Sequence, residues 1–246
     1  MRTLDEAVWA DLVRATGLDV STSPLRPLGD HPAHSEPPEP ALVEATALAL
    51  GRADVGLTLM SGAGDRGVLA QIGSDRHVLG VAARAIVPAV SGPVAVPGVR
   101  LGAHPASSVV DQVMRLVPPG GGARELPRAP VSLDQETALV ITRTAVDDAD
   151  VALAAARRAG LDVVPPVLQA LARGTSASVT LTVSTSGEPL HAVRQWLLTD
   201  LGWVSLTIRG RRVVHTARSR SELAASTTSL VAGAWDAALA ARERAS

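Results

Sequence analysis

The sequence predicts an α+β fold in which two similar halves share an antiparallel sheet. Two strand-like runs carry this prediction, Val55–Ser61 and Val179–Thr185, because the segments around each run match in type and order. A third observation is the Pro- and Gly-rich stretch Pro118–Ala123, which lies close to the midpoint of the 246 residues. We therefore expect a first half at 1–122 and a second half at 123–246, together forming one compact domain.

The matching elements can be followed along both halves. Segments Leu4–Val8 and Leu133–Thr137 agree, and an apolar helix is expected before each run, at 40–50 and at 163–172. Three further strands should follow each run, at 67–72, 77–84 and 99–104 in the first half and at 190–198, 202–209 and 212–216 in the second. An insertion at 86–97 occurs in the first half only.

Each half should close with a capped helix. Ser108 is followed three residues later by Asp111, and Ser219 is followed three residues later by Glu222. A Ser and an acid at this spacing can satisfy the free backbone donors at a helix start reciprocally. The last helix should bury one stripe, formed by Leu223, Thr227, Leu230, Ala234 and Ala238.

Composition limits the possible functions. Apolar residues make up 46% of the chain and the formal net charge is -1, values typical of a globular protein and not of a nucleic-acid binder. The chain has no Cys, and all its basic residues are Arg, so thiolate and lysine chemistry are unavailable. No stretch is apolar enough to span a bilayer, and no signal segment is evident, so we expect a soluble cytoplasmic protein with no membrane contact.

One motif favours an enzyme. Gly62–Gly67 reads G-x-G-x-x-G directly after an apolar strand, as in dinucleotide-binding folds. Such a fold needs a long helix next, but Gly73 interrupts the following stretch, and the second half has Ser186–Pro189 at this place. A Gly-rich hairpin loop is the better interpretation, and a nucleotide-binding enzyme that uses this loop is kept as an alternative.

Other candidate chemistry is weak. His31 and His34 could bind a metal with Glu36, yet no helix fixes their spacing, so we expect no metal site. His104 and His215 take equivalent places at the ends of the fourth strands and should be structural. We expect no catalytic residues, no cofactor and no enzyme activity, although a hydrolase triad assembled in space stays open.

The third strands show alternation that is typical of a sheet packed on one side and open on the other. Val204, Leu206 and Ile208 share the apolar face, whereas the open face carries Trp203, Ser205, Thr207 and Arg209. In the first half, Arg84 coincides with Arg209. The open face is either an ordinary solvated surface or a partner-binding surface, for which Trp and Arg are favoured.

The chain also resembles the EspG family of type VII (ESX) secretion. The resemblance is carried by four segments in order: Leu4–Leu12 with Gly17–Asp19 and a Pro-rich loop, the Ala- and Leu-rich helix before Asp54, the hairpin Val68–Arg84, and the hairpin Gly202–Thr216 with its following helix. It implies a quasi-two-fold fold in which two helical subdomains flank a central antiparallel sheet. It also implies a cytosolic chaperone that binds PE–PPE heterodimers and keeps them soluble for export.

In that family, the sheet and the loop between its second and third strands bind the partner, and this loop would be Gly73–His77 here. Together with the open face, the predicted partner-binding residues are Ser74, Asp75, Arg76, His77, Arg84, Trp203 and Arg209. The expected partner is a PE–PPE-like or other type VII secretion substrate, and not a nucleic acid. The free protein could be a homodimer, and a scaffold that dimerises through its sheet edges is a further alternative.

Overall fold

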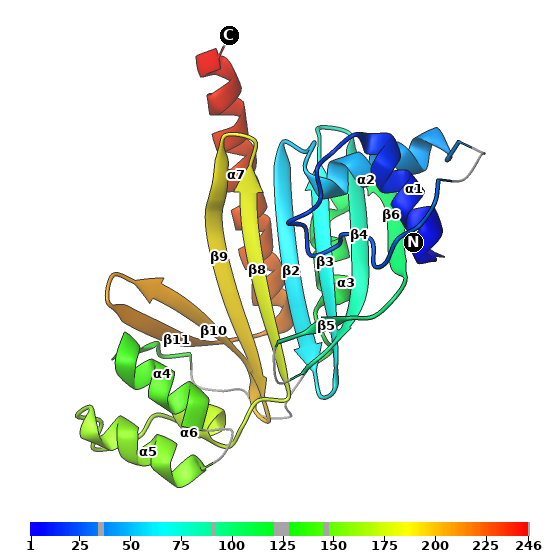
Figure 1. Cartoon of the computed structure of the whole chain (residues 1–246). Helices are drawn as coiled ribbons and strands as arrows, with labels where there is room; N and C mark the ends of the chain where they lie inside the picture. The colour runs from blue at the N-terminus through cyan, green and yellow to red at the C-terminus, as the bar shows by residue number, and fades with distance from the viewer. Residues whose placement is uncertain (34–36, 90–91, 121–127, 145–147, 246) are drawn as a thin grey trace. The chain divides into compact units, whose positions relative to one another are not determined.

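The computed structural model describes residues 1–33, 37–89, 92–120, 128–144 and 148–245, which form two compact units (Figure 1). Unit 1 comprises Met1–Val117, Leu181–Val193 and Ser226–Ser246, and unit 2 comprises Pro118–Thr180 and Arg194–Ala225. Three elements run through both units: β8 (Ala177–Thr185), β9 (Glu188–Thr199) and α7 (Arg220–Ala245). Helices and an antiparallel sheet together confirm the predicted α+β class.

Unit 1 is a sheet with helices on both faces. Its elements are β1 (Arg2–Leu4), α1 (Glu6–Thr16), α2 (Pro40–Leu50), β2 (Val55–Ala63), β3 (Arg66–Ser74), β4 (Val78–Val87), β5 (Val94–Ala95), β6 (Val99–Pro105) and α3 (Val109–Leu116). The strand order is β1-β6-β4-β3-β2-β8-β9, with β5 paired to β4. In Figure 1, α1 and α2 lie in front of β4 and β6, whereas α3 and the unit 1 part of α7 lie behind the strands.

The core between α1, α2 and the sheet is apolar and close-fitting. Trp9 and Leu12 of α1 pack with Ala82 and Leu101 of the sheet, and all four side chains are buried. At Gly80 a Cβ would lie only 2.2 Å from the Ala45 carbonyl oxygen of α2. Glycine is therefore required where this helix crosses β4, and a methyl group there would push the helix away.

Unit 2 places three helices on one face of its strands. Its elements are β7 (Val131–Asp134), α4 (Gln135–Thr144), α5 (Ala149–Arg158), α6 (Pro166–Ala172), β10 (Gly202–Arg209) and β11 (Arg212–Arg218). The strand order is β8-β9-β10-β11-β7. Leu168 and Leu171 of α6 share a core with Leu197, Val204 and Ala217 of the strands.

The predicted strands are confirmed, with bounds that differ by a few residues. The Gly62–Gly67 motif lies in the β2–β3 hairpin, where Ala63 pairs with Arg66 and Gly64 turns the chain with φ 59°. The next element is β3 and not a helix, so the loop has no helix N-terminus for a pyrophosphate. The dinucleotide interpretation is therefore wrong, and the hairpin interpretation is confirmed.

The two predicted helix caps have different outcomes. At α7, the Ser219 amide donates to Glu222 Oε2 at 2.7 Å and the Glu222 amide donates to Ser219 Oγ at 3.2 Å, which confirms the reciprocal cap. At α3, the prediction is wrong because the Ser108 hydroxyl donates to the Pro105 carbonyl oxygen at 2.7 Å and makes no cap bond. The buried stripe of α7 is confirmed apart from Leu230, since the neighbouring Val231 is buried instead.

The matched segments at the start of each half share one local structure. In Leu4–Val8 a strand ends and Asp5 Oδ1 accepts the Val8 amide at 2.9 Å, which caps α1. In Leu133–Thr137 a strand ends and Asp134 Oδ1 accepts the Thr137 amide at 2.8 Å, at the start of α4. The duplication itself stays a prediction, and the proposed boundary at 122 and 123 lies outside the described residues.

Candidate partner-binding surface

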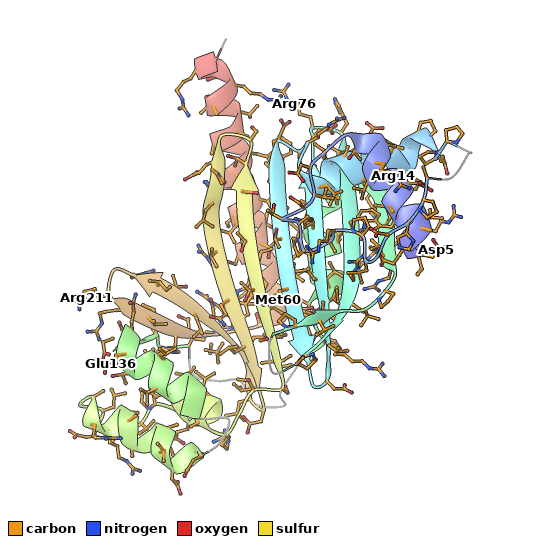
Figure 2. The ribbon with its side chains drawn as sticks, in the orientation of Figure 1. Asp5, Arg14, Met60, Arg76, Glu136 and Arg211 are labelled. Carbon is orange, nitrogen blue, oxygen red and sulfur yellow. The ribbon has the colours of Figure 1, made fainter. Side chains whose placement is uncertain are left out.

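The β3–β4 turn, Asp75–His77, is held rigidly by its own polar groups. Asp75 Oδ1 accepts the amides of His77 and Val78, both at 2.7 Å. These hydrogen bonds lower the pKa of the Asp75 carboxyl, and the one from the Val78 amide has the largest effect. Ser74 is buried below the turn, with its hydroxyl 2.7 Å from the Asp75 carbonyl oxygen. Of the four predicted loop residues, Arg76 and His77 are exposed, and Figure 2 labels Arg76 at the turn.

Asp54 ties this turn to two distant segments of unit 1. Its amide donates to the Ser74 carbonyl oxygen at 3.0 Å, and its carbonyl oxygen accepts the Ser186 amide at 3.0 Å. Its carboxylate forms an ion pair with Arg242 near the end of α7. The β3–β4 turn, the β8–β9 turn and the end of α7 therefore meet at one end of the sheet. No local sequence pattern predicts this arrangement, since Asp54 and Arg242 are 188 residues apart.

From this end toward the β2–β3 hairpin, one strip of the sheet carries side chains that no described helix covers. On β2, Val55, Leu57 and Leu59 are buried toward α3 and α7, whereas Thr58 and Met60 point to the opposite face. On β8, Ser184 lies on that opposite face, because a Cβ at Gly56 would be 2.8 Å from Ser184 Oγ. We call the uncovered residues Thr58, Met60, Thr182 and Ser184 the open strip, of which Figure 2 labels Met60.

The open strip is uncharged and mixed in character. Met60 is 43% exposed, and the three hydroxyl side chains of the strip are half-buried. An exposed thioether is adaptable, and hydroxyl groups can donate or accept hydrogen bonds. The strip can therefore contact an apolar side chain and the polar backbone beside it, and it offers no group suited to proton transfer or metal binding.

Arg84 was predicted on an open face, and the structure shows that this placement is wrong. Its side chain is fully buried, and its Nη2 donates to both carboxylate oxygens of Glu6, at 2.7 and 2.9 Å. Glu6 also accepts the backbone amides of Leu28 and Gly98, each at 2.7 Å. Burial lowers the pKa of the Arg84 guanidinium, and the Glu6 charge opposes this shift. Helices α1 and α2 cover the face that alternation alone had left open.

Trp203 was also predicted on an open face, and it too is buried. In register it pairs with Leu198, and the backbone of Gly120 approaches both residues, since a Cβ there would lie 2.6 Å from Leu198 and 3.1 Å from Trp203 Nε1. Arg209, by contrast, is exposed in the β10–β11 hairpin. Arg84 and Arg209 are therefore not an equivalent exposed pair.

Among the described residues, the histidines form no recognisable metal-binding set. His31 Nε2 lies 2.8 Å from the Leu28 carbonyl oxygen, whereas His34 and Glu36 lie outside the described residues. Within the described ranges, no group of three or more His, Cys, Asp and Glu side chains could hold a metal ion. Burial lowers the pKa of both His104 and His215. No helix in the part of the chain that the structure describes is long and apolar enough to cross a membrane.

Comparison with known proteins identifies a shared fold. The chain matches no protein-family model and no curated protein. Among solved structures it is similar to the Mycobacterium tuberculosis type VII secretion system chaperone EspG5, in a complex with the PE25-PPE41 dimer, with a TM-score of 0.63 at 11% identity over 94% of this chain and 95% of that chain. The fold resemblance to EspG is thereby confirmed. A match to full-length peroxisomal multifunctional enzyme type 2 from Drosophila melanogaster has a TM-score of 0.21 at 12% identity, covers 88% of this chain and 47% of that chain, and carries no argument.

Proposed function

We propose that this protein is a cytosolic chaperone of type VII secretion, which binds a PE–PPE-like heterodimer and keeps it soluble for export. The observation that carries the proposal is the likeness to EspG5, because it extends over nearly the whole of both chains. The EspG5 structure is that of a chaperone bound to a PE25-PPE41 dimer. A binding function also agrees with a described surface whose side chains suggest contact and not catalysis.

The client surface that we propose combines the β3–β4 turn with the open strip. The turn presents Arg76 and His77 on a backbone that Asp75 holds in place, so little conformational freedom is lost on binding. The strip adds Met60, whose exposed side chain would be buried by an apolar client residue. Both parts belong to unit 1.

Such a chaperone acts by mass action. Binding the folded client, but not its unfolded or aggregated forms, stabilises the folded form in proportion to the logarithm of the free chaperone concentration. At a concentration about 100 times the Kd, the stabilisation is about 2.7 kcal/mol. No covalent step or energy source is needed for this effect.

The test is co-expression with the PE–PPE-like pair encoded nearest to the gene of this protein, followed by affinity purification and light scattering. We expect a stable complex with the unmodified chain, and Arg76→Glu or Met60→Glu should weaken it at least about tenfold. Arg66→Glu is the matched control, because Arg66 is an exposed arginine beside the β2–β3 turn of the same unit. Equal co-purification of the client by all four proteins would contradict the proposed surface, and no complex with any of them would contradict the function.

Asp75 is unsuitable for this test, although it is a predicted contact. Its carboxylate holds the turn, so a substitution there would change the backbone of Arg76 and His77 as well as any direct contact. Loss of binding in an Asp75 variant would not distinguish these two causes. Arg76 is the better probe, because charge reversal at an exposed turn residue leaves the fold intact.

A further inference from the structure

The end of the β10–β11 hairpin in unit 2 concentrates positive charge. Arg209 pairs with Arg212, and Gly210 with Arg211 forms the two-residue turn between them, with Gly210 at φ 59°. Three of four consecutive positions are therefore arginine in a chain whose formal net charge is -1. Ile208, directly before Arg209, is 70% exposed. We call Arg209, Arg211 and Arg212 the basic tip.

The backbone of the basic tip is anchored. Arg212 donates from Nε to Ser132 Oγ and from Nη2 to the Ser132 carbonyl oxygen, both at 2.7 Å. Gln135 donates from its amide to the Arg211 carbonyl oxygen and from Nε2 to the Gly210 carbonyl oxygen, each at 3.2 Å. Arg212 thus fixes the hairpin to β7 and Gln135 fixes it to the start of α4, so the backbone of the tip is preorganised.

The guanidinium groups of the other two arginines, Arg209 and Arg211, have unused hydrogen-bond donors. Arg209 and Arg211 are exposed, and neither guanidinium makes a hydrogen bond or ion pair with another described residue. Each guanidinium offers donors in a planar fork that matches a carboxylate. Ile208 is exposed on the other face of the hairpin, since successive side chains of a strand alternate, so the ligand that suits the tip is one that offers carboxylates to the two arginines.

We infer that the basic tip is a docking site for an acidic segment of a partner protein. Arg209 and Arg211 take carboxylates of this segment. The inference goes beyond the proposed function, since it concerns a second surface, on unit 2, and holds whether or not the client surface is on unit 1.

Two other classes of ligand fit less well. Base stacking in single-stranded nucleic acid needs exposed aromatic side chains, but Trp196 and Trp203 of unit 2 are buried. Anionic membranes are recognised by clusters of about four to eight basic residues, whereas the tip has two exposed arginines free of an anchor. A short acidic peptide therefore matches the size and chemistry of the tip better than either polyanion.

The test measures fluorescence anisotropy of a labelled peptide that repeats Glu-Glu-Leu, titrated with the full chain. We expect saturable binding that weakens when sodium chloride rises from about 0.1 M to about 0.5 M. Arg209→Glu/Arg211→Glu should weaken binding at least about tenfold, whereas Ile208→Ser, on the other face of the hairpin, should stay within about twofold of the unmodified chain. Arg66→Glu is the matched control, since Gly64 turns its hairpin at the same φ as Gly210. It should stay within about twofold of the unmodified chain.

Four results would overturn the inference. These are no binding of the acidic peptide, equal binding of a Gln-Gln-Leu peptide, equal weakening by Arg66→Glu, and tighter binding to a dT oligonucleotide or to phosphatidylserine vesicles. Client co-purification with the same variants separates this inference from the proposed function. A double variant that loses the peptide and keeps the client supports a second surface, whereas one that loses both would place the tip in the client surface and end the claim of a separate site.

Discussion

Replacing Glu6 by Gln should remove a large part of the stability of unit 1. The Glu6 carboxylate is the counter-charge of Arg84, whose side chain has no exposed surface. Breaking a buried ion pair from one side leaves an uncompensated charge and costs about 3–5 kcal/mol. The free energy of unfolding of an ordinary domain is about 5–15 kcal/mol, so this loss would be a sizeable fraction of the total.

The contacts of Glu6 explain why glutamine is a poor substitute. Besides the Arg84 guanidinium, the carboxylate accepts hydrogen bonds from the backbone amides of Leu28 and Gly98. Each of its two oxygens therefore accepts hydrogen bonds from two donors. A glutamine side chain would turn an NH₂ group toward one of these pairs of donors. At least one donor would then be buried without an acceptor, which costs about 1–3 kcal/mol in addition to the charge effect.

The assay is urea unfolding followed by tryptophan fluorescence, because Trp9 lies in the core that α1 forms with the sheet. Glu6→Gln should lower the urea midpoint without changing the slope. Asp200→Asn is the matched control, because the Arg173–Asp200 pair is about half exposed and its loss should cost about 0–1 kcal/mol. If both variants unfolded within about 1 kcal/mol of the unmodified chain, the buried pair would not be the stabilising contact that its geometry implies.

Three further predictions concern packing and pH. Gly80→Ala should destabilise the protein by about 1–3 kcal/mol, because its Cβ would meet the Ala45 carbonyl oxygen at 2.2 Å. Gly233→Ala in the interior of α7 should instead stabilise by about 0.5–1 kcal/mol, since its Cβ meets only His191 Nε2 at 3.7 Å; thermal unfolding checks both. Burial lowers the pKa of His215, so the unfolded chain takes up a proton that the folded chain does not, and stability should fall as the pH drops below about 6.5. The urea midpoint should therefore fall between about pH 7 and pH 5.5. In the His215→Leu variant this fall should be smaller, and an equal fall in both proteins would contradict the assignment to His215.

Local sequence patterns were sufficient to predict the strands and the main turns. Alternation in Val55–Ser61 and Val179–Thr185 fixes which side chains share a face, since neighbouring side chains of a strand point to opposite faces. The interruption at Gly73 correctly favoured a hairpin over a dinucleotide loop. The reciprocal cap at Ser219 and Glu222 was predictable because all its groups lie within four residues.

Coverage of a sheet face could not be predicted in the same way. Arg84 is buried because Glu6, 78 residues earlier in the chain, lies on a helix that crosses this part of the sheet. No pattern within β4 specifies that contact, and a charged residue on a strand is more often exposed. At Ser108 a local pattern predicted a contact that is absent. The spacing to Asp111 suits a helix cap, but the Ser108 hydroxyl donates to the Pro105 carbonyl oxygen instead.

Arg84 and Arg209 show that burial and hydrogen-bond partners decide which arginine is available to bind another protein. Both end an alternating strand pattern, and both were expected to line one kind of surface. Arg84 finds a carboxylate and a carbonyl oxygen within the fold, so its donors stabilise unit 1 and cannot serve a partner without unfolding it. Arg209 finds no such group among the described residues, and its hairpin is held by Arg212 and Gln135 instead. Because an anchored turn loses little entropy on binding, the donors of Arg209 are available to another protein at low cost. The difference between a core residue and a docking residue therefore depends on which acceptors the fold supplies, and not on the residue type or its place in the strand.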